Sequence, residues 1–185
     1  MVFFLGIGLF FCVHAVGLFP RLRVKLVDGI GQNAYLGLYS LMSLAGLACL
    51  VLGFDSSYQL LSPTRVTADV YSTGRYWMFL SFWFLISANL PTYVKHWTSH
   101  PMTWGIVIWG VGHMLINPDL HSRVLFGAFV VFVLVSAITS SRRSRPTGES
   151  KPKAVLDLVC FCLALLLTYL AGQFHGSFTA VTLPL

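Results

Sequence analysis

Long apolar stretches without charged residues alternate with short polar segments along this chain. Each stretch holds about 18 residues or more, enough for an α-helix to cross a hydrocarbon core of ~30 Å. None shows the strand-length alternation of apolar and polar positions that is typical of a transmembrane β-barrel. The charge-free windows are Met1–Pro20, Gly29–Phe54, Tyr76–Val94, His96–Pro118, Val124–Ser141 and Leu158–Leu185. The pattern predicts an all-α, polytopic transmembrane bundle of about six helices, with residues 1–185 forming a single domain.

Prolines and polar clusters set the expected limits of these helices. Pro20 ends the first helix because proline biases the preceding residue away from the helical conformation, and Pro101 suits a first helical position. The first window lacks a basic start and a small-residue cleavage site, so we expect a retained helix rather than a signal peptide. The polar segments 55–74 and 141–153 are expected to be loops. The expected helices are Val2–Phe19, Ala34–Phe54, Arg75–Leu90, Pro101–Asn117, His121–Ser140 and Ala154–His175.

The basic residues predict an orientation, because loops on the cytoplasmic side of a membrane carry an excess of Lys and Arg. With the N-terminus outside, the outer side holds only Arg65, Arg75 and Arg123. The inner side holds the remaining nine of the 12 basic residues: Arg21, Arg23, Lys25, Lys95, Arg142, Arg143, Arg145, Lys151 and Lys153. We therefore expect both termini outside.

The composition supports a membrane protein. Only 10% of the residues are charged while 56% are hydrophobic, and the mean hydropathy is +0.77, which leaves too little charge to cover a soluble domain. The net charge of +6 follows from the orientation signal, so it requires no nucleic-acid partner. Cys160 and Cys162 are two positions apart on a helix and face different sides, so we interpret the cysteines as small apolar residues.

Two histidines stand inside the apolar windows. His14 and His113 lie in the first and fourth of them, where an ionisable side chain is costly and by default suggests a functional site. The alternative is a neutral histidine that hydrogen-bonds to a neighbouring helix. His100 precedes Pro101 and is a candidate cap for the fourth helix. His96, His121 and His175 lie near predicted helix ends, where a polar tip reaching water is the usual explanation.

A flat cofactor suits this pair of histidines better than a bare ion does. No acidic residue or third histidine is placed at the same depth, whereas heme supplies four nitrogens and needs one or two axial ligands. Gly105, Trp109 and Gly112 share a helix face beside His113, where the small residues admit either a planar ring or another helix. Helix packing is the more common cause of such a face.

The surroundings of His14 leave two questions open. In a continuous helix Arg21 would lie on the same face about 10 Å away, where it could hold a propionate, although Pro20 intervenes and the positive-inside rule alone explains the charge. With opposite helix directions, His14 lies towards the inside and His113 towards the outside, about 10 Å apart in depth. Ligation of one iron by both is therefore a hypothesis that helix tilt must satisfy.

Several blocks resemble the NnrU family of bacterial membrane proteins. They are "FFCVHAV…PRLRVKL", "GQNAYLGLYSLMSLAGL", "SHPMTWGIVIWGVGHMLINPDLHSRVLFGAFVVF" and the following "SRR", which together cover most of residues 4–143. The family is similar to the zeta-carotene isomerase of plants and cyanobacteria, a membrane protein that binds heme b. The resemblance implies a location in the bacterial inner membrane and a heme b cofactor.

The resemblance also implies roles for individual residues. Phe11 and His14 match the F-x-x-H pattern, and Trp109 and His113 match W-x-x-x-H, so both histidines correspond to the proposed heme ligands. The H-P-x-x-W-G block matches His100, Pro101, Trp104 and Gly105. One departure matters: the isomerase has a cysteine after the tryptophan, as a candidate alternative iron ligand, where this chain has Gly110.

Three functions are consistent with these features. The first is a non-enzymatic heme or redox protein linked to nitrite and nitric oxide metabolism, to which the name of the bacterial branch refers, with a protein of that pathway as partner. The second is a heme-dependent cis–trans isomerase acting on a carotenoid or another lipid-soluble polyene. The third is a cofactor-free helical protein for transport or assembly. The residues proposed for cofactor binding are His14, His113, Arg21, Trp109, Gly112 and His100.

Overall fold

The structure, a computed structural model, describes residues 1–54, 67–98, 100–141 and 151–179. Regular structure within these ranges is helical throughout. The elements are α1 Val2–Ala15, the 3₁₀ helix η1 Val16–Leu18, α2 Pro20–Ile30, α3 Gln32–Gly53, α4 Ala68–Ser72, α5 Gly74–Ser87, α6 Tyr93–Trp97, α7 Pro101–Ile116, α8 Leu120–Ser141 and α9 Ala154–Thr179.

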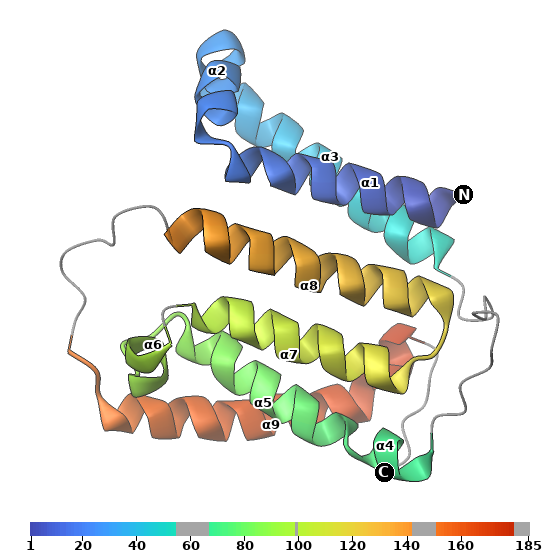
Figure 1. Ribbon diagram of the computed structural model, residues 1–185, viewed down its shortest axis with the longest axis vertical. Helices are drawn as coiled ribbons and strands as arrows, with labels where there is room; N and C mark the ends of the chain where they lie inside the picture. Colours follow the sequence, from blue (N-terminus) through green and yellow to red (C-terminus); the bar gives the residue numbers. More distant parts are fainter. Residues whose placement is uncertain (55–66, 99, 142–150, 180–185) are drawn as a thin grey trace.

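Each helix expected from an apolar window is present, with similar limits. Three shorter helices, α2, α4 and α6, fall between the expected long helices. Of the two predicted loops, residues 55–66 and 142–150 lie outside the described residues. The long helices α1, α3, α5, α7, α8 and α9 run in alternating directions, so their ends collect on two sides of the molecule (Figure 1).

Not all of these helices have the length of a membrane span. Within the described residues, Gln32–Gly53, Leu120–Thr139 and Ala154–His175 are long and apolar enough to cross a membrane, and the bent pair α1–η1 and α2 raises the number from three to four. α7 is apolar but has 16 residues, or about 24 Å, and α5 has 14 residues. The protein is thus a helical membrane protein, while six spans remain a prediction.

Glycines bring α1 and α3 into close contact. A methyl group added at Gly46 would lie 2.8 Å from the Phe10 backbone nitrogen, and one at Gly6 would lie 2.6 Å from the Leu50 backbone nitrogen. At Gly53 it would collide with the Phe3 backbone. Such small residues let two helix backbones approach in an apolar environment. α1 and α3 therefore form a tightly packed helical pair.

The remaining long helices form a second group. α7 packs between α5 and α8, and α5 also packs against α9 (Figure 1). Ser81 of α5 donates a buried hydrogen bond of 2.9 Å to the Gly105 carbonyl oxygen of α7. Asp157 of α9 accepts hydrogen bonds from the backbone N–H groups of Tyr93 and Val94, which belong to the first turn of α6. These polar contacts fix the order of α5, α6, α7 and α9.

α2 leaves the line of α1 at a bend of 99°. The bend falls at Phe19, whose φ of −112° and ψ of 85° are not helical, because Pro20 excludes the helical conformation from the residue before it. Gly31 then turns the chain into α3 with a φ of +83°, a conformation that side chains rarely tolerate. Residues 20–30, most of which lie between the first two apolar windows of the sequence, therefore form a helix of their own.

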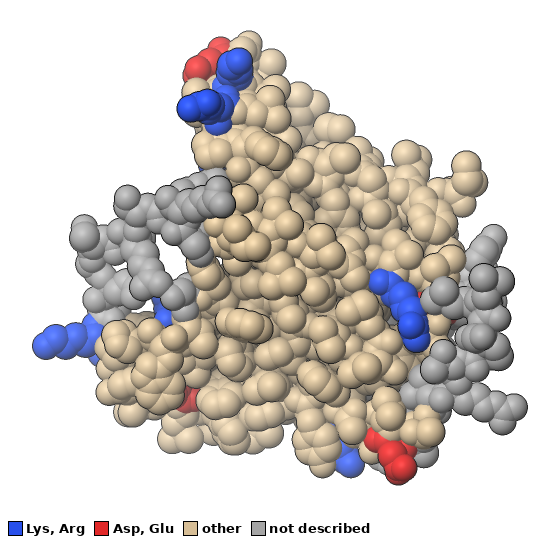
Figure 2. Space-filling view, in the orientation of Figure 1, with Lys and Arg blue, Asp and Glu red and all other residues tan. Residues whose placement is uncertain are grey.

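Among the described residues, charge lies at or near the ends of the long helices and on the short helices α2, α4 and α6. Figure 2 shows an uncharged surface between these regions. The side that holds α2, α6 and the start of α9 carries most of the described basic residues, whereas Arg75 and Arg123 lie near the starts of α5 and α8 on the opposite side (Figure 1). This separation agrees with the sorting of basic residues in the sequence, and the N-outside orientation stays a prediction.

Candidate functional site

His14 lies in the last turn of α1, half-buried among aromatic rings. Its Nδ1 atom is 2.7 Å from the Phe10 carbonyl oxygen, one helical turn earlier. The imidazole stacks on the Phe10 ring, with centroids 4.1 Å apart, and its centroid is 5.5 Å from that of Tyr39 on α3. The Phe132 ring of α8 meets it edge-on at 6.3 Å. The ring is thus held by contacts from α1, α3 and α8.

His113, in the last turn of α7, has the same local arrangement. Its Nδ1 atom is 2.9 Å from the Trp109 carbonyl oxygen, again one turn earlier. The imidazole stacks on Phe126 of α8 at a centroid distance of 4.3 Å, and the Trp109 ring is 5.2 Å away. His175 of α9 interacts electrostatically with the His113 ring. Both histidines are therefore fixed to their own helix and packed against α8.

This arrangement selects one form of each imidazole. A carbonyl oxygen can only accept a hydrogen bond, so Nδ1 must carry the proton in both rings. In the neutral imidazole, Nε2 then holds the free lone pair, which is the form that binds a metal. Metal-bound histidines commonly donate the other ring N–H to a carbonyl in this way. In both residues, therefore, Nε2 is the ring nitrogen that could accept a hydrogen bond or bind a metal.

An aromatic layer connects the two histidines. The Phe129 ring of α8 lies 5.7 Å from the Phe10 ring and 5.5 Å from the Trp109 ring. Phe10 and Trp109 are the residues whose carbonyl oxygens hydrogen-bond to His14 and His113. Phe129 and Phe132 also contact Phe11 of α1. We call Phe10, Phe11, Trp109, Phe126, Phe129 and Phe132 the aromatic layer. It joins the α1–α3 pair to α7 and α8.

The histidines stand at different heights along α8. His113 stacks on Phe126, whereas His14 meets Phe132, six positions further along the helix. At 1.5 Å per residue this is an offset of about 9 Å, similar to the depth difference expected from the sequence. The structure thus brings both imidazoles to the same helix but to separate turns of it.

The glycine face of α7 packs against a helix. A methyl group at Gly112 would lie 2.7 Å from Trp77 Cβ, and one at Gly105 would meet Leu85, both residues of α5. Gly110 faces α8, where an added methyl group would lie 2.6 Å from Val130. Helix packing, the more common cause of such a face, describes these glycines. Side chains of α5 occupy the place where a porphyrin ring was considered.

Arg21 does not share a helix face with His14, because the chain bends between them. It lies beyond the 99° bend and lines a shallow hollow with Leu18, Phe19 and Pro20. Arg23 is placed differently. Its charge interacts electrostatically with Tyr39, whose ring contacts the His14 ring. The shared face that a continuous helix would give is therefore not formed, and a role for Arg21 in cofactor binding stays a prediction.

His100 occupies the position before α7, as expected for a cap, but its side chain makes no capping hydrogen bond there. His121 corrects an expectation from the sequence, which gave it a polar tip that reaches water. It is only 5% exposed and stacks on Phe3 at 4.2 Å, with Phe4 and Phe54 close by. Asp119 is the feature of the sequence that could have indicated this position, because aspartate is a common helix N-cap. Its carboxylate accepts a hydrogen bond from the Ser122 N–H, so α8 begins before His121. His121 is a packed residue of the helix.

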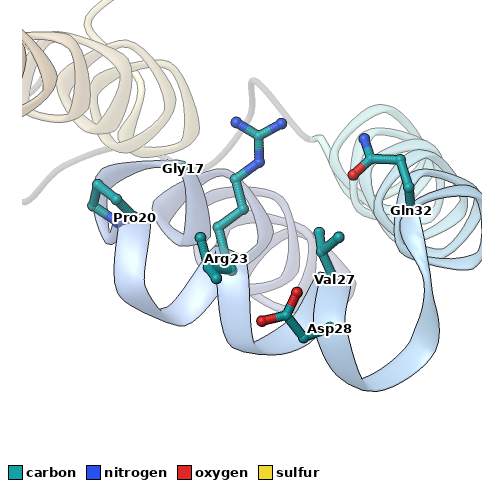
Figure 3. Close-up of a pocket in the computed structure, with 7 residues that line it drawn as sticks. Gly17, Pro20, Arg23, Val27, Asp28 and Gln32 are labelled. Atoms are coloured by element: carbon teal, nitrogen blue, oxygen red, sulfur yellow. The ribbon is translucent and has the colours of Figure 1, made fainter.

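Ligands for a bare metal ion do not come together. Among the described residues, no three His, Cys, Asp or Glu side chains are close enough to hold one. Two cavities of about 280 and 320 Å³ lie at η1 and α2, and neither is lined by His14 or His113. Figure 3 shows the first of them, with Arg23 extending from α2 and Gln32 lying across from it on α3. His14 and His113 thus lie outside both cavities.

These observations define a class: a helical membrane protein with two internal histidines, each fixed at Nδ1 and packed on one central helix. A family model described as "NnrU protein" matches residues 2–183, nearly the whole chain. The chain belongs to the NnrU family. No curated protein and no solved structure matches it.

Proposed function

We propose that this NnrU-family protein binds heme b in the bacterial inner membrane, with His14 and His113 as axial ligands. The observation that carries the proposal is the shared hydrogen bond from Nδ1 to a carbonyl oxygen, 2.7 Å in one ring and 2.9 Å in the other. This bond leaves Nε2 of each neutral ring as a metal-binding atom.

The residues around the pair fit the chemistry of a heme in two further ways. The aromatic layer provides an apolar, polarisable surrounding for a flat conjugated ring. We propose Arg23 in place of Arg21 as the residue that would hold a propionate, because its charge acts on Tyr39, whose ring contacts His14. A bound heme would supply a redox-active iron. The chain itself would position that iron, exclude water from it and set its potential through the axial imidazoles.

The offset of about 9 Å along α8 bears on how many irons are held. One iron shared by both histidines requires movement of the α1–α3 pair relative to α7. We propose that heme binding includes this movement, since α1 meets α8 through the side chains of the aromatic layer and packs its backbone on α3. We propose a single shared iron, and the ligand experiment below separates it from two independent sites.

For the wider role, we propose a non-enzymatic redox or heme protein linked to nitrite and nitric oxide metabolism. The support for this link is membership of the NnrU family. The alternative of a polyene isomerase lacks an observation in its favour. The position of its candidate sulfur ligand is Gly110, which is buried and packed so closely on Val130 that a side chain there would displace α8.

Absorption spectra of the detergent-purified protein and of His14→Ala and His113→Ala test the ligands. If both rings bind one iron, each variant should change the wild-type spectrum to that of a heme with one protein ligand, and the double variant should lose the heme. His96→Ala is the matched control, because His96 is exposed on α6 and lies outside the aromatic layer. Two independent sites would instead halve the heme content in each single variant. Unchanged spectra in both single variants would contradict the assignment.

A further inference from the structure

We infer that α2 is an in-plane membrane helix whose apolar face enters the lipid interface and whose basic residues bind the phosphates of anionic lipids. The first observation is its direction. α2 lies at 99° to α1, at the side of the molecule where the described basic residues collect (Figure 1). If α1 crosses the bilayer, α2 must lie along its surface.

The second observation is an apolar stripe that the described residues leave uncovered. Leu22, Leu26 and Ile30 recur at every fourth position, so they line one face of the helix. Their side chains are 44%, 37% and 47% exposed, and Phe19 just before the helix is 60% exposed. A surface helix in water would not display such a stripe, whereas an interfacial helix buries it at the level of the headgroups and upper acyl chains.

The third observation is the distribution of charge around this stripe. Lys25 flanks the stripe, and Arg21 lies one helical turn earlier and further round on the same side of the helix; both side chains are exposed. Arg23 lies at the other edge, and Asp28 is the one acidic residue of the helix. Basic residues that border an apolar face at the membrane surface attract anionic headgroups. Charge complementarity therefore favours a lipid surface over a second copy of this chain, which would bring the same positive charges.

The opposite face of α2 borders a cavity, and its Val24 side chain is also exposed, at 57%. Pro20, Arg23, Val24, Val27 and Asp28 line the cavity between α2 and the start of α3 (Figure 3). Labels attached at positions 24 and 26 would therefore probe different sides of one helix. This pair allows a test in which the label, the helix and the depth of the chain segment are matched.

The test uses the full chain in vesicles of phosphatidylcholine, with or without phosphatidylglycerol. A polarity-sensitive fluorophore is attached after Leu26→Cys or Val24→Cys, in a background where Cys12, Cys49, Cys160 and Cys162 are alanine. We expect the fluorophore of Leu26→Cys to be shielded from iodide, with emission shifted further to the blue when phosphatidylglycerol is present. The fluorophore of Val24→Cys should remain accessible to iodide. Equal iodide access at both positions would overturn the proposal.

Charge variants separate the possible occupants. Arg21→Gln with Lys25→Gln should abolish the effect of phosphatidylglycerol. Lys151→Gln with Lys153→Gln makes the same change in charge beside α9 and should preserve it. The proposal fails if shielding depends on the protein-to-lipid ratio, which would indicate a second copy, or if inorganic phosphate at constant ionic strength reverses it, which would indicate a small-anion site.

A second measurement needs no cysteine replacement. Anionic lipid that co-purifies with the otherwise native chain should fall in the Arg21→Gln, Lys25→Gln variant and stay unchanged in the Lys151→Gln, Lys153→Gln variant. Equal retention in the two variants would contradict a specific role for α2.

Discussion

The rings of Phe10 and Phe129 lie 5.7 Å apart, and through this pair the helix that carries His14 meets α8. Phe129 also reaches Trp109, whose carbonyl oxygen holds the second histidine. One phenylalanine thus contacts the supporting residue of each imidazole. The relationship explains how two histidines on helices that do not pack directly against each other can belong to one site.

The aromatic layer gives a first prediction about stability. Phe129→Ala removes ring contacts with Phe10, Phe11 and Trp109 and should destabilise the protein by about 3 kcal/mol. Melting temperature in detergent is the measurement. Phe174→Ala is the matched control, because Phe174 on α9 is 54% exposed and should tolerate the change. Equal melting temperatures for the two variants would show that the layer does not join the helices.

The α1–α3 contact predicts a difference between two glycines of the same helix. Gly46→Val forces a side chain against the Phe10 backbone and should cost about 1–3 kcal/mol. Gly37→Val, also on α3, meets nothing within 4 Å and should leave stability nearly unchanged. Thermal unfolding of both variants is the test. A similar loss at Gly37 would mean that valine disturbs α3 itself rather than its packing.

Gly112 separates helix packing from cofactor contact. Because Trp77 of α5 covers this position, Gly112→Val should lower the melting temperature while heme per folded molecule stays unchanged. Gly127→Val on α8 is the control, since a methyl group there makes only an ordinary contact with Met114 at 3.7 Å. Heme lost from Gly112→Val at full stability would place the porphyrin against this face after all.

The orientation is tested by thiol labelling in intact cells. With the native cysteines replaced, Arg123→Cys should react quickly with a membrane-impermeant reagent if, as expected from the sequence, its side faces the periplasm. Lys151→Cys, exposed on the opposite side, should react only after the cells are opened. The reverse pattern would invert the protein in the membrane and move α2 to the periplasmic surface.

Features within single segments of the sequence predicted where the helices lie, but not how the helices are oriented and packed against one another. Charge-free windows and the prolines at 20 and 101 located the long helices, because apolar length and proline geometry act within one segment. α2 was missed since its alternating basic and apolar residues interrupt every such window. Arg21 does not lie on the same helix face as His14 for a related reason. The backbone of Phe19 is not helical, so α2 runs in a different direction from α1.

The site was predictable only in part. His14 and His113 stood out because ionisable residues are rare in apolar helices. Their shared link to α8 was not visible, because periodicity within one helix does not reveal its neighbours. The burial of His121 beneath Phe3 depends on the same long-range information. The glycine face of α7 had two interpretations, and only the position of Trp77 decided between them.

The central claim is that the two fixed imidazoles hold a heme, and the heme content of the wild-type protein tests it most directly. The protein is purified in mild detergent from cells supplied with a heme precursor, and extracted protoheme is measured against protein mass. We predict one protoheme per chain, with a Soret band and visible bands that sharpen on reduction, as expected for two imidazole ligands. A folded, monodisperse protein that carries no Soret band under these conditions would contradict the account.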